Sequence, residues 1–371
     1  MRKEYTIVDT DIHPGVPTKK LLPRLAQPWR MRLEQGNRSS GTMGYWNPNG
    51  VNRPDAVLDD GTRIENDPTA LAEHWLTPHQ IDYGILNCGS VLHLGLSPEP
   101  DYAIALISAY NDVIVEEWLA ADPRYRASIA VYPYDIDAAV REIQRLGDLP
   151  GVVQVIMPSS ARQAYGQRYF HPIFEAATAY KLPVAIHPGT EGVGISGAPT
   201  NLGYPSSYFE WHTNLVSSYI GHMTSLILEG AFAKFPTFKF VLLEGGVSWV
   251  PPILWRMDKN WKALRMTTPW VDRPPSAIAQ EHFLLSTQPV EEPENPKHFH
   301  QILAMFPAEK MLMFSTDYPH WDGDTPDFAA RQFPKELRPA IMGQNACKLY
   351  GLEELVNKPI EVSENRTGAH Q

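Results

Sequence analysis

Short apolar runs rich in β-branched residues recur along the chain, and segments with helical periodicity separate them. Eight such runs are present: YTIVDTD, IDYGILNC, ASIAVYP, GVVQVIM, LPVAIHP, FKFVLLEGG, HFLLSTQP and MLMFSTDYP. Each has the length and composition of a buried strand. Between them, apolar residues recur at spacings of three and four, which is typical of a helix with one buried face. This spacing predicts helices over Asp101–Ala121, Ile136–Leu146, Pro172–Lys181, Leu215–Ala233 and Pro334–Leu349.

The alternation of strand and helix predicts an α/β fold, a (β/α)₈ TIM barrel that forms a single domain over residues 1–355. A doubly wound open sheet is the alternative, but that fold is expected to carry a Gly-rich phosphate loop after an early strand. The sequence has no such loop there. Residues 356–371 are polar and aperiodic, so we expect them to form a flexible tail that adds nothing to the barrel.

A long insertion interrupts the alternation after the first strand. Residues 14–68 are rich in Pro, Asn, Gly and Trp, and a helical pattern resumes only around Thr69 to His79. Irregular connections longer than about 15 residues are uncommon in compact domains unless they are functional. We therefore expect a lid over the mouth of the barrel, with an arm that contacts a second subunit as the alternative.

Charge and cysteine content exclude several classes of protein. The chain has 371 residues and a formal net charge of −10, which disfavours nucleic-acid partners because those are bound through clustered Lys and Arg. We expect a small-molecule substrate and, as the commonest oligomer, a homodimer. Two cysteines are too few for a disulfide framework and suit the cytoplasm. The N-terminus lacks the apolar core of an export signal, and no run approaches the roughly 18 apolar residues of a membrane span.

Polar residues occupy the ends of the predicted strands, where a barrel of this kind gathers its reactive groups. Strand one ends with Asp11 and His13 on one side of the backbone, strand five with His187, and strand eight with Asp317. Taken singly, these residues have structural explanations: a hydrogen-bonded turn, a buried histidine and a helix N-cap. Imidazoles and carboxylates that converge on one mouth need a counter-charge, however, which a divalent cation supplies. The four residues together therefore predict a metal site.

These motifs also resemble those of a known superfamily. Asp11-x-His13, IHPG at His187, FAKFPTFKFVLLEGG and FSTDYPH at Asp317 are similar to motifs of the amidohydrolase superfamily. The resemblance runs from about Tyr5 to Leu352 and is closest to the branch that contains aminocarboxymuconate-semialdehyde decarboxylase and the dihydroxybenzoate decarboxylases. It implies a metal-dependent barrel enzyme. It also implies that Asp11 and His13 replace the HxH pair of strand one, that His187 is the strand-five ligand, and that Asp317 binds metal and shuttles protons.

The chain departs from this branch at the end of strand six. The branch usually carries a catalytic His in an HGG motif, whereas this chain reads Leu-Glu244-Gly-Gly. Glu244 is therefore a candidate catalytic residue, either as a general base once burial raises its pKa or as a direct metal ligand. Three carboxylates, from Asp11, Asp317 and Glu244, would favour Mn²⁺ over Zn²⁺. Zn²⁺ is narrowly the first expectation, with Mn²⁺ as the alternative and no organic cofactor.

Four further residues are candidates for contact with the substrate. Trp211 and His212 follow strand five in a loop, where they would stack on and hydrogen-bond an aromatic substrate, with His212 as a catalytic candidate. His320 lies three residues past Asp317 and would orient that aspartate beside the substrate. Arg53, in the expected lid, would clamp a carboxylate. Local loop packing and a solvated surface arginine are the structural alternatives.

Three hypotheses for function follow. The first is non-oxidative decarboxylation of an aromatic or unsaturated carboxylic acid, with Asp317 delivering the proton. The second is hydrolysis of an amide, ester, lactone or carbon–carbon bond by metal-activated water, with Asp317 or Glu244 as base. The third is a metal-stabilised binding protein without catalysis, which a proton-shuttling Asp317 argues against.

Overall fold

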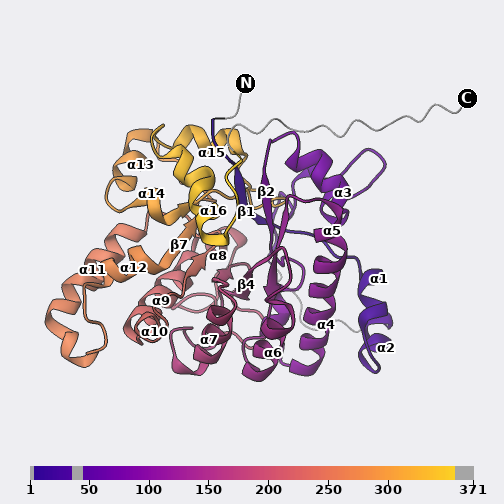
Figure 1. Ribbon diagram of the computed structural model, residues 1–371, viewed down its shortest axis with the longest axis horizontal. Helices are drawn as coiled ribbons and strands as arrows, with labels where there is room; N and C mark the ends of the chain where they lie inside the picture. Colours follow the sequence, from indigo (N-terminus) through magenta and orange to yellow (C-terminus); the bar gives the residue numbers. More distant parts are fainter. Residues whose placement is uncertain (1–3, 36–44, 356–371) are drawn as a thin grey trace, which may run out of the picture.

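Eight parallel strands form one sheet whose spatial order follows the chain, and helices lie around this sheet (Figure 1). The computed structural model describes residues 4–35 and 45–355. Each strand pairs with the next in parallel register, and almost every strand residue is buried. The strands are β1 (Val8–Ile12), β2 (Tyr83–Leu86), β3 (Tyr125–Ala130), β4 (Val152–Pro158), β5 (Val184–His187), β6 (Phe240–Leu242), β7 (Phe283–Ser286) and β8 (Leu312–Met313).

Hydrogen bonds between the segment of β1 and the residues that follow β8 close the sheet into a barrel. The backbone N–H of Thr10 donates to the carbonyl of Phe314 at 3.0 Å, and that of His13 donates to the carbonyl of Tyr318 at 2.8 Å. The predicted (β/α)₈ barrel is therefore confirmed, and the doubly wound alternative is wrong. Strand β8 is shorter than the run MLMFSTDYP suggested: it ends at Met313, and the chain turns later, at Asp317, whose φ is 58°.

Helices surround the barrel, and most of the predicted ones are present. The prediction for Ile136–Leu146 matches its helix at both ends, whereas the prediction for Leu215–Ala233 is divided by Gly230 at a φ of 77°. The last predicted helix begins late, because Pro339 has no N–H to continue a helix that started at Pro334. The helices are α1 (Thr18–Leu21), α2 (Trp29–Glu34), α3 (Pro68–Leu71), α4 (Pro100–Val113), α5 (Leu119–Ala121), α6 (Ile136–Leu146), α7 (His171–Ala179), α8 (Tyr208–Thr213), α9 (Val216–Leu228), α10 (Ala231–Lys234), α11 (Val250–Leu264), α12 (Pro275–His282), α13 (Pro296–Leu303), α14 (Ala308–Met311), α15 (Pro326–Gln332) and α16 (Asn345–Tyr350).

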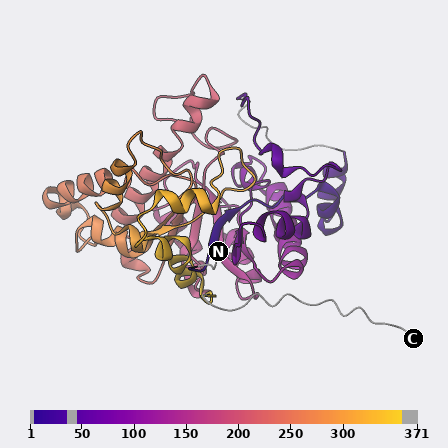
Figure 2. The ribbon, with the colours of Figure 1, turned by 90° about the horizontal axis from the view of Figure 1, so that it is seen from above.

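The insertion after β1 divides into two parts with different positions. Its first part, α1 and α2, lies on the outer side of α4 (Figure 1). Ion pairs hold it there, among them Lys20–Glu117 at 2.7 Å and Arg24–Glu116 at 2.6 Å. Its second part, from Tyr45 onward, rises on the same side of the molecule as the segment that follows β5, opposite the N-terminus (Figure 2). Within the predicted lid over residues 14–68, we call α1 and α2 the side brace and the part from Tyr45 onward the mouth segment. Residues 36–44 lie outside the described residues.

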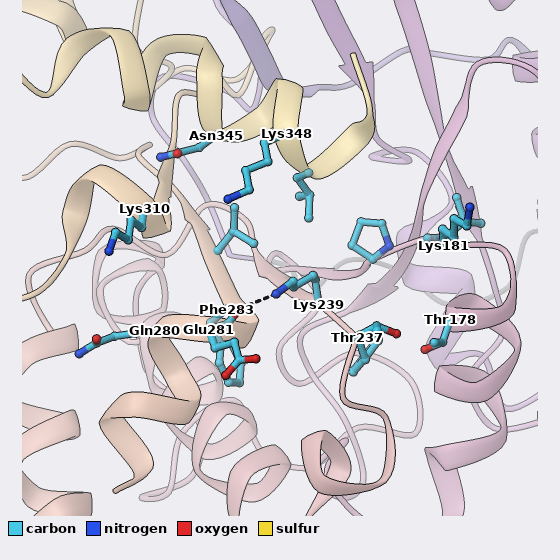
Figure 3. A pocket seen from close by; sticks show the side chains of 15 residues that line it. Thr178, Lys181, Thr237, Lys239, Gln280, Glu281, Phe283, Lys310, Asn345 and Lys348 are labelled. Atoms are coloured by element: carbon cyan, nitrogen blue, oxygen red, sulfur yellow. Dashed lines mark hydrogen bonds between the residues drawn. The ribbon is translucent and has the colours of Figure 1, made fainter. Parts of the chain in front are cut away.

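The two ends of the barrel carry different side chains. Where β5 to β8 begin, a cavity of about 490 Å³ is lined by Lys181, Lys239, Lys310 and Lys348 (Figure 3). No histidine lines it among the described residues. Polar groups suited to metal binding gather instead at the other end, where the strands finish.

Other expectations concern the cysteines, the membrane and the tail. Cys88 and Cys347 are both buried, and neither forms a disulfide. In the part of the chain from 4 to 35 and from 45 to 355, no helix has the length and apolar character needed to cross a bilayer. The predicted flexible tail, residues 356–371, lies outside the described residues.

His222 lies in α9 and connects this helix to the segment that follows β4. Its Nδ1 accepts a hydrogen bond from the Tyr165 N–H at 3.1 Å, and its Nε2 donates to the carbonyl of Ser159 at 2.6 Å. Burial lowers the pKa of His222 to about 4 from an ordinary 6.5. The unfolded chain therefore takes up this proton at a higher pH than the folded chain does, so stability is lost as the pH falls from about 6.5 toward 4.

Replacing His222 with glutamine should remove this contribution to the pH dependence. Between pH 7 and pH 5, the unfolding free energy of the wild type should fall by roughly 2 kcal/mol more than that of the variant. Urea unfolding at both pH values measures the difference. An identical decrease in the two proteins would contradict the assignment.

Candidate metal centre

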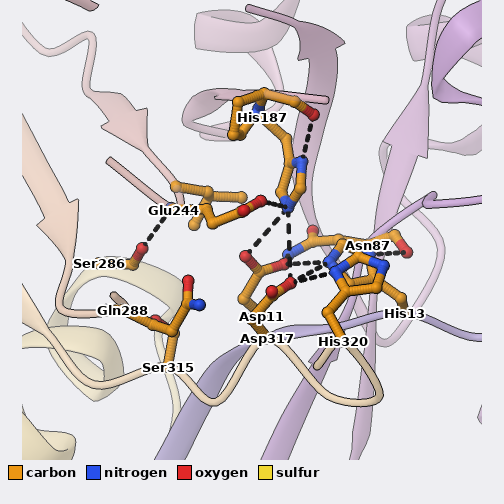
Figure 4. A network of polar contacts seen from close by, with 12 residues as sticks. Asp11, His13, Asn87, His187, Glu244, Ser286, Gln288, Ser315, Asp317 and His320 are labelled. Atoms are coloured by element: carbon orange, nitrogen blue, oxygen red, sulfur yellow. Dashed lines mark hydrogen bonds and ion pairs between the residues drawn. The ribbon is translucent and has the colours of Figure 1, made fainter. Parts of the chain in front are cut away.

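The four side chains predicted to bind metal meet at the C-terminal end of the barrel (Figure 4). Asp11 and His13 come from the end of β1, His187 is the last residue of β5, and Asp317 follows β8. Their candidate ligand atoms all lie within 4.8 Å of one another, and all four side chains are buried. His13 Nε2 is 2.9 Å from Asp317 Oδ1, and His187 Nε2 is 3.3 Å from Asp11 Oδ2. Residues separated by more than 300 positions thus share one cluster.

Backbone carbonyls orient both imidazoles toward the centre of this cluster. Nδ1 of His13 lies 3.3 Å from the carbonyl of Asn87, and Nδ1 of His187 lies 2.9 Å from the carbonyl of Pro188. A carbonyl only accepts hydrogen bonds, so each Nδ1 carries the proton that it donates. The lone pair of each Nε2 is then free to face the carboxylates, which is the usual orientation of a metal-binding histidine.

The cluster contains polar atoms that the protein itself does not satisfy. Asp11 Oδ2, Asp317 Oδ2 and His187 Nε2 are buried and have no hydrogen-bond partner within the described part of the chain. Leaving such atoms unpaired is costly, especially when they are charged. A divalent cation between them would satisfy all three at once, so the donor set fits a metal.

The titration behaviour of the cluster indicates the same need for positive charge. Burial alone would lower the pKa of His187, but the charges of Asp11 and Asp317 raise it to about 9. Burial would raise the pKa of Asp317, but His320 and His13 hold it well below its ordinary value. The Asp317 carboxylate is therefore ionised, and without a metal the His187 imidazole carries compensating positive charge.

His320 lies directly against Asp317, as the sequence predicted. Its Nδ1 is 2.7 Å from Asp317 Oδ1, and its ring stacks on that of His13 with centroids 4.5 Å apart. Burial opposes protonation of His320, but the negative charge of Asp317 raises the pKa above its ordinary value. His320 therefore donates a hydrogen bond to the aspartate while its ring lines the cavity described below.

Glu244 follows β6 in a left-handed backbone conformation, with a φ of 54°. Non-glycine residues held in this region are strained and often functional. The next residue must be glycine, because a Cβ on Gly245 would lie 2.4 Å from the ring of Tyr219. Oε2 of Glu244 is 3.1 Å from His187 Nε2. Burial, followed by the charges of nearby carboxylates, raises the pKa of Glu244 well above its ordinary value.

A cavity of about 450 Å³ opens directly over the cluster. The mouth segment of the insertion and the segment after β5 supply most of its wall, and no Lys or Arg lines it among the described residues. Trp211 is fixed in this wall because its indole N–H donates to the carbonyl of Glu191 at 3.1 Å. The aromatic and aliphatic lining consists of Tyr45, Trp46, Val51, Leu92, Val193, Tyr208, Trp211, Leu215 and Trp321.

His212 lines the same cavity and lies beside an acidic residue that we did not anticipate. Its Nε2 is 3.4 Å from Asp322 Oδ2 and 3.9 Å from Glu244 Oε1. The only signal for Asp322 in the sequence was its place five residues after Asp317 in the same loop. Asn87 was also missed, although its side-chain amide donates to Asp11 Oδ1 at 2.8 Å from the end of β2.

Arg53 is the one of the four substrate-contact candidates that the structure does not bring to the cavity. Its guanidinium binds Asp55 at 2.7 Å and lies 5.2 Å from the ring centroid of Trp75. Its backbone N–H donates to the carbonyl of Pro319 at 2.8 Å, so the residue fastens the insertion to the loop after β8. With its charge paired there, it is not placed to hold a substrate carboxylate.

Comparisons with known proteins identify the family and the fold of the chain. The family model described as Amidohydrolase matches residues 99–352. A gamma-resorcylate decarboxylase from Rhizobium sp. (strain MTP-10005) is 25% identical over 198 residues, which cover 50% of this chain and 56% of the relative. The chain therefore spans little more than half the length of that relative.

Two solved decarboxylase structures share the fold of this chain. The 5-carboxyvanillate decarboxylase from Sphingomonas paucimobilis has a TM-score of 0.67 and 19% identity, with 94% of this chain and 99% of that chain covered. A dihydroxybenzoic acid decarboxylase from Polaromonas sp. JS666, with bound manganese and 2-nitroresorcinol, has a TM-score of 0.66 and 19% identity, with 95% and 97% covered. At these identities, the likeness shows the barrel fold.

Proposed function

Because the chain belongs to the amidohydrolase family, we propose that it is a metal-dependent enzyme that decarboxylates an aromatic or unsaturated carboxylic acid without oxidation. One observation carries this proposal: a buried set of four metal-binding side chains opens into a cavity with aromatic walls and no cationic side chain in its described lining. An aromatic ring suits such walls. The positive charge that attracts the substrate carboxylate would then come from the metal held by these four side chains.

Asp11, His13, His187 and Asp317 would hold the metal. When bound, a divalent ion at this place would orient the substrate carboxylate and stabilise the negative charge that develops as carbon dioxide leaves. Glu244 and Asp322 add carboxylate oxygens at short range, and such surroundings favour Mn²⁺. We therefore propose Mn²⁺ in place of our narrow first expectation of Zn²⁺, as in the manganese-containing Polaromonas decarboxylase.

The chain's own residues would position the ring and move the proton. Trp211 is rigid because of its hydrogen bond with Glu191, so it offers a fixed face for the ring. His320 Nδ1 would pass its proton to Asp317 Oδ1 across their 2.7 Å contact, and Asp317 would deliver that proton to the ring carbon as the bond to carbon dioxide breaks.

The cavity lining also predicts a substrate class. Glu244 and Asp322 face the cavity, and no Lys or Arg of the described lining offsets them. A second carboxylate on the substrate would find no cationic side chain in this lining to pair with, which is costly. We therefore propose a monocarboxylic acid with neutral, apolar substituents.

Hydrolysis remains the second candidate because Glu244 stands where relatives of this branch usually carry histidine. A buried glutamate whose pKa is raised can accept a proton from water near neutral pH. The two reactions differ in their products, since only hydrolysis transfers an oxygen atom from water to the product. Incorporation of ¹⁸O from labelled water, without release of carbon dioxide, would favour hydrolysis over our proposal.

Metal removal tests the proposal directly. Protein dialysed against a chelator should lose at least about 99% of its activity, since the metal supplies the charge that the reaction needs, and added Mn²⁺ should restore it. The assay is carbon dioxide release from hydroxybenzoates and related monocarboxylic acids, with dicarboxylic analogues as the contrasting panel. Stoichiometric metal without turnover on any of them would support the binding-protein hypothesis.

The cellular setting stays a prediction from the sequence. We propose a cytoplasmic homodimer, with the α1–α2 side brace as the candidate contact. Light scattering of the purified chain would measure its mass in solution, and a monomer would contradict this part of the proposal.

A further inference from the structure

We infer that the mouth of the barrel holds a second divalent cation, bound by His212, Glu244 and Asp322, with Glu244 as a carboxylate bridge to the first metal. The second site rests on the proposed metal-dependent function and extends it. Within the described residues, these three side chains form a group of metal-binding type whose ligand atoms all lie within 4.8 Å of one another. The group shares no residue with the cluster of Asp11, His13, His187 and Asp317.

The distances in this group suit a shared cation. His212 Nε2 lies 3.4 Å from Asp322 Oδ2 and 3.9 Å from Glu244 Oε1. Ligands that each sit about 2.0–2.4 Å from one ion are separated by such distances. Asp322 Oδ2 is buried and accepts no hydrogen bond from the described part of the chain. The His212 ring is also held in place, since it stacks on Tyr208 with centroids 5.4 Å apart.

Glu244 lies between the two groups of candidate metal ligands and joins them. Its side chain is 9% exposed, and no described residue donates a hydrogen bond to its carboxylate; the contacts are with imidazoles. Oε2 is 3.1 Å from His187 in the first cluster, whereas Oε1 is 3.9 Å from His212 in the second. Figure 4 shows this carboxylate directed at His187 from the end of β6. Each oxygen therefore faces a different candidate metal position.

The charge of the mouth supports two cations over one. Asp11, Asp317, Glu244 and Asp322 carry a formal charge of −4 when ionised, and one dication would leave −2 next to an anionic substrate. No Lys or Arg of the described lining corrects this excess. Asp317 with His320 and Glu244 forms another group of metal-binding type, but it takes Asp317 from the first cluster and so adds no independent site. A second dication makes the four carboxylates and two metals neutral overall.

Metal counting on the full chain tests the second site. Protein loaded with Mn²⁺ and passed through a desalting column should contain two equivalents per chain by elemental analysis. Two Mn²⁺ ions that share a carboxylate lie about 3.5–4 Å apart, so their spins couple and the EPR spectrum should differ from that of isolated Mn²⁺. His212→Asn and Asp322→Asn should each contain one equivalent, with an uncoupled spectrum.

Glu210→Gln is the matched control, because Glu210 lies on α8 beside His212 and its carboxylate accepts from Ser206 N–H at 3.0 Å, away from the cavity lining. It should retain two equivalents and the coupled spectrum. One equivalent in the wild type would overturn the second site and leave the proposed function intact. No bound metal at all would overturn both. Two equivalents that persist in both His212→Asn and Asp322→Asn would overturn the ligand assignment.

Discussion

Replacing Asp317 with asparagine is expected to lower kcat for decarboxylation by roughly 10³-fold or more while the barrel stays folded. Asp317 Oδ1 is the common partner of His13, at 2.9 Å, and His320, at 2.7 Å. The amide keeps the shape of the side chain but removes both the negative charge and the site that carries the proton. Positioned acids and bases contribute about 10²–10⁴-fold to rate, and this residue is also a candidate ligand.

The measurement compares kcat, bound Mn²⁺ and the thermal midpoint of the variant with those of the wild type. Asp324→Asn is the matched control, seven residues further along the same loop, where the Asp324 carboxylate accepts from the N–H of Val290 at 2.9 Å. Burial raises the pKa of Asp324 to about 7, so this group is partly neutral at physiological pH and tolerates an amide. It should keep most of the wild-type activity. An Asp317→Asn protein with more than a tenth of that activity would contradict the proton-delivery role.

Replacing His187 with alanine is expected to weaken Mn²⁺ binding at the first site by at least about 100-fold. Loss of a residue that only orients a ligand already costs about 10–100-fold in metal affinity, and His187 is itself a candidate ligand. The substitution also leaves a space beside Asp11 and Asp317, whose charges His187 balances when no metal is bound. Free imidazole fits this space and should restore part of the activity.

Competition with a chelating dye measures the affinity, and imidazole titration measures the rescue. His171→Ala is the matched control, because His171 is also buried but binds the carbonyl of Gly166, at 3.1 Å, away from the cavity. It should lose stability yet keep its Mn²⁺ affinity. Equal affinity in His187→Ala and the wild type would remove His187 from the site, and activity that imidazole raises equally in both alanine variants would discount the rescue.

The sequence was informative wherever a local pattern of residues determines the structure. Strand and helix periodicity depends on which side chains face the core, so the eight strands and α6 could be identified from spacing alone. Because parallel strands present their C-terminal ends at one mouth, knowing the strands also placed Asp11, His187 and Asp317 together without coordinates. The acidic and imidazole types of these residues then indicated a metal.

The orientation of individual side chains could not be predicted from such local patterns. Arg53 belongs to a segment that does reach the mouth, but its guanidinium contacts Asp55 and Trp75 instead of the cavity. Which neighbour a side chain contacts depends on tertiary packing, so the sequence could not show it. In the sequence, nothing distinguishes Asp322 from other acidic residues of loops. In the structure, the loop after β8 places Asp322 Oδ2 3.4 Å from His212 Nε2. Asn87 became relevant only because β2 pairs with β1 in a register that sets its amide against Asp11.

By itself, then, the sequence determined the barrel, the order of its strands and the residue types at its mouth, because those follow from short-range periodicity and from the shared direction of parallel strands. The tertiary structure alone decided that Glu244 faces two imidazoles at once and that the insertion braces one flank as well as lining the cavity. These features depend on backbone angles such as the positive φ of Glu244 and Asp317, and on contacts between segments hundreds of residues apart. No local pattern in the chain encodes them.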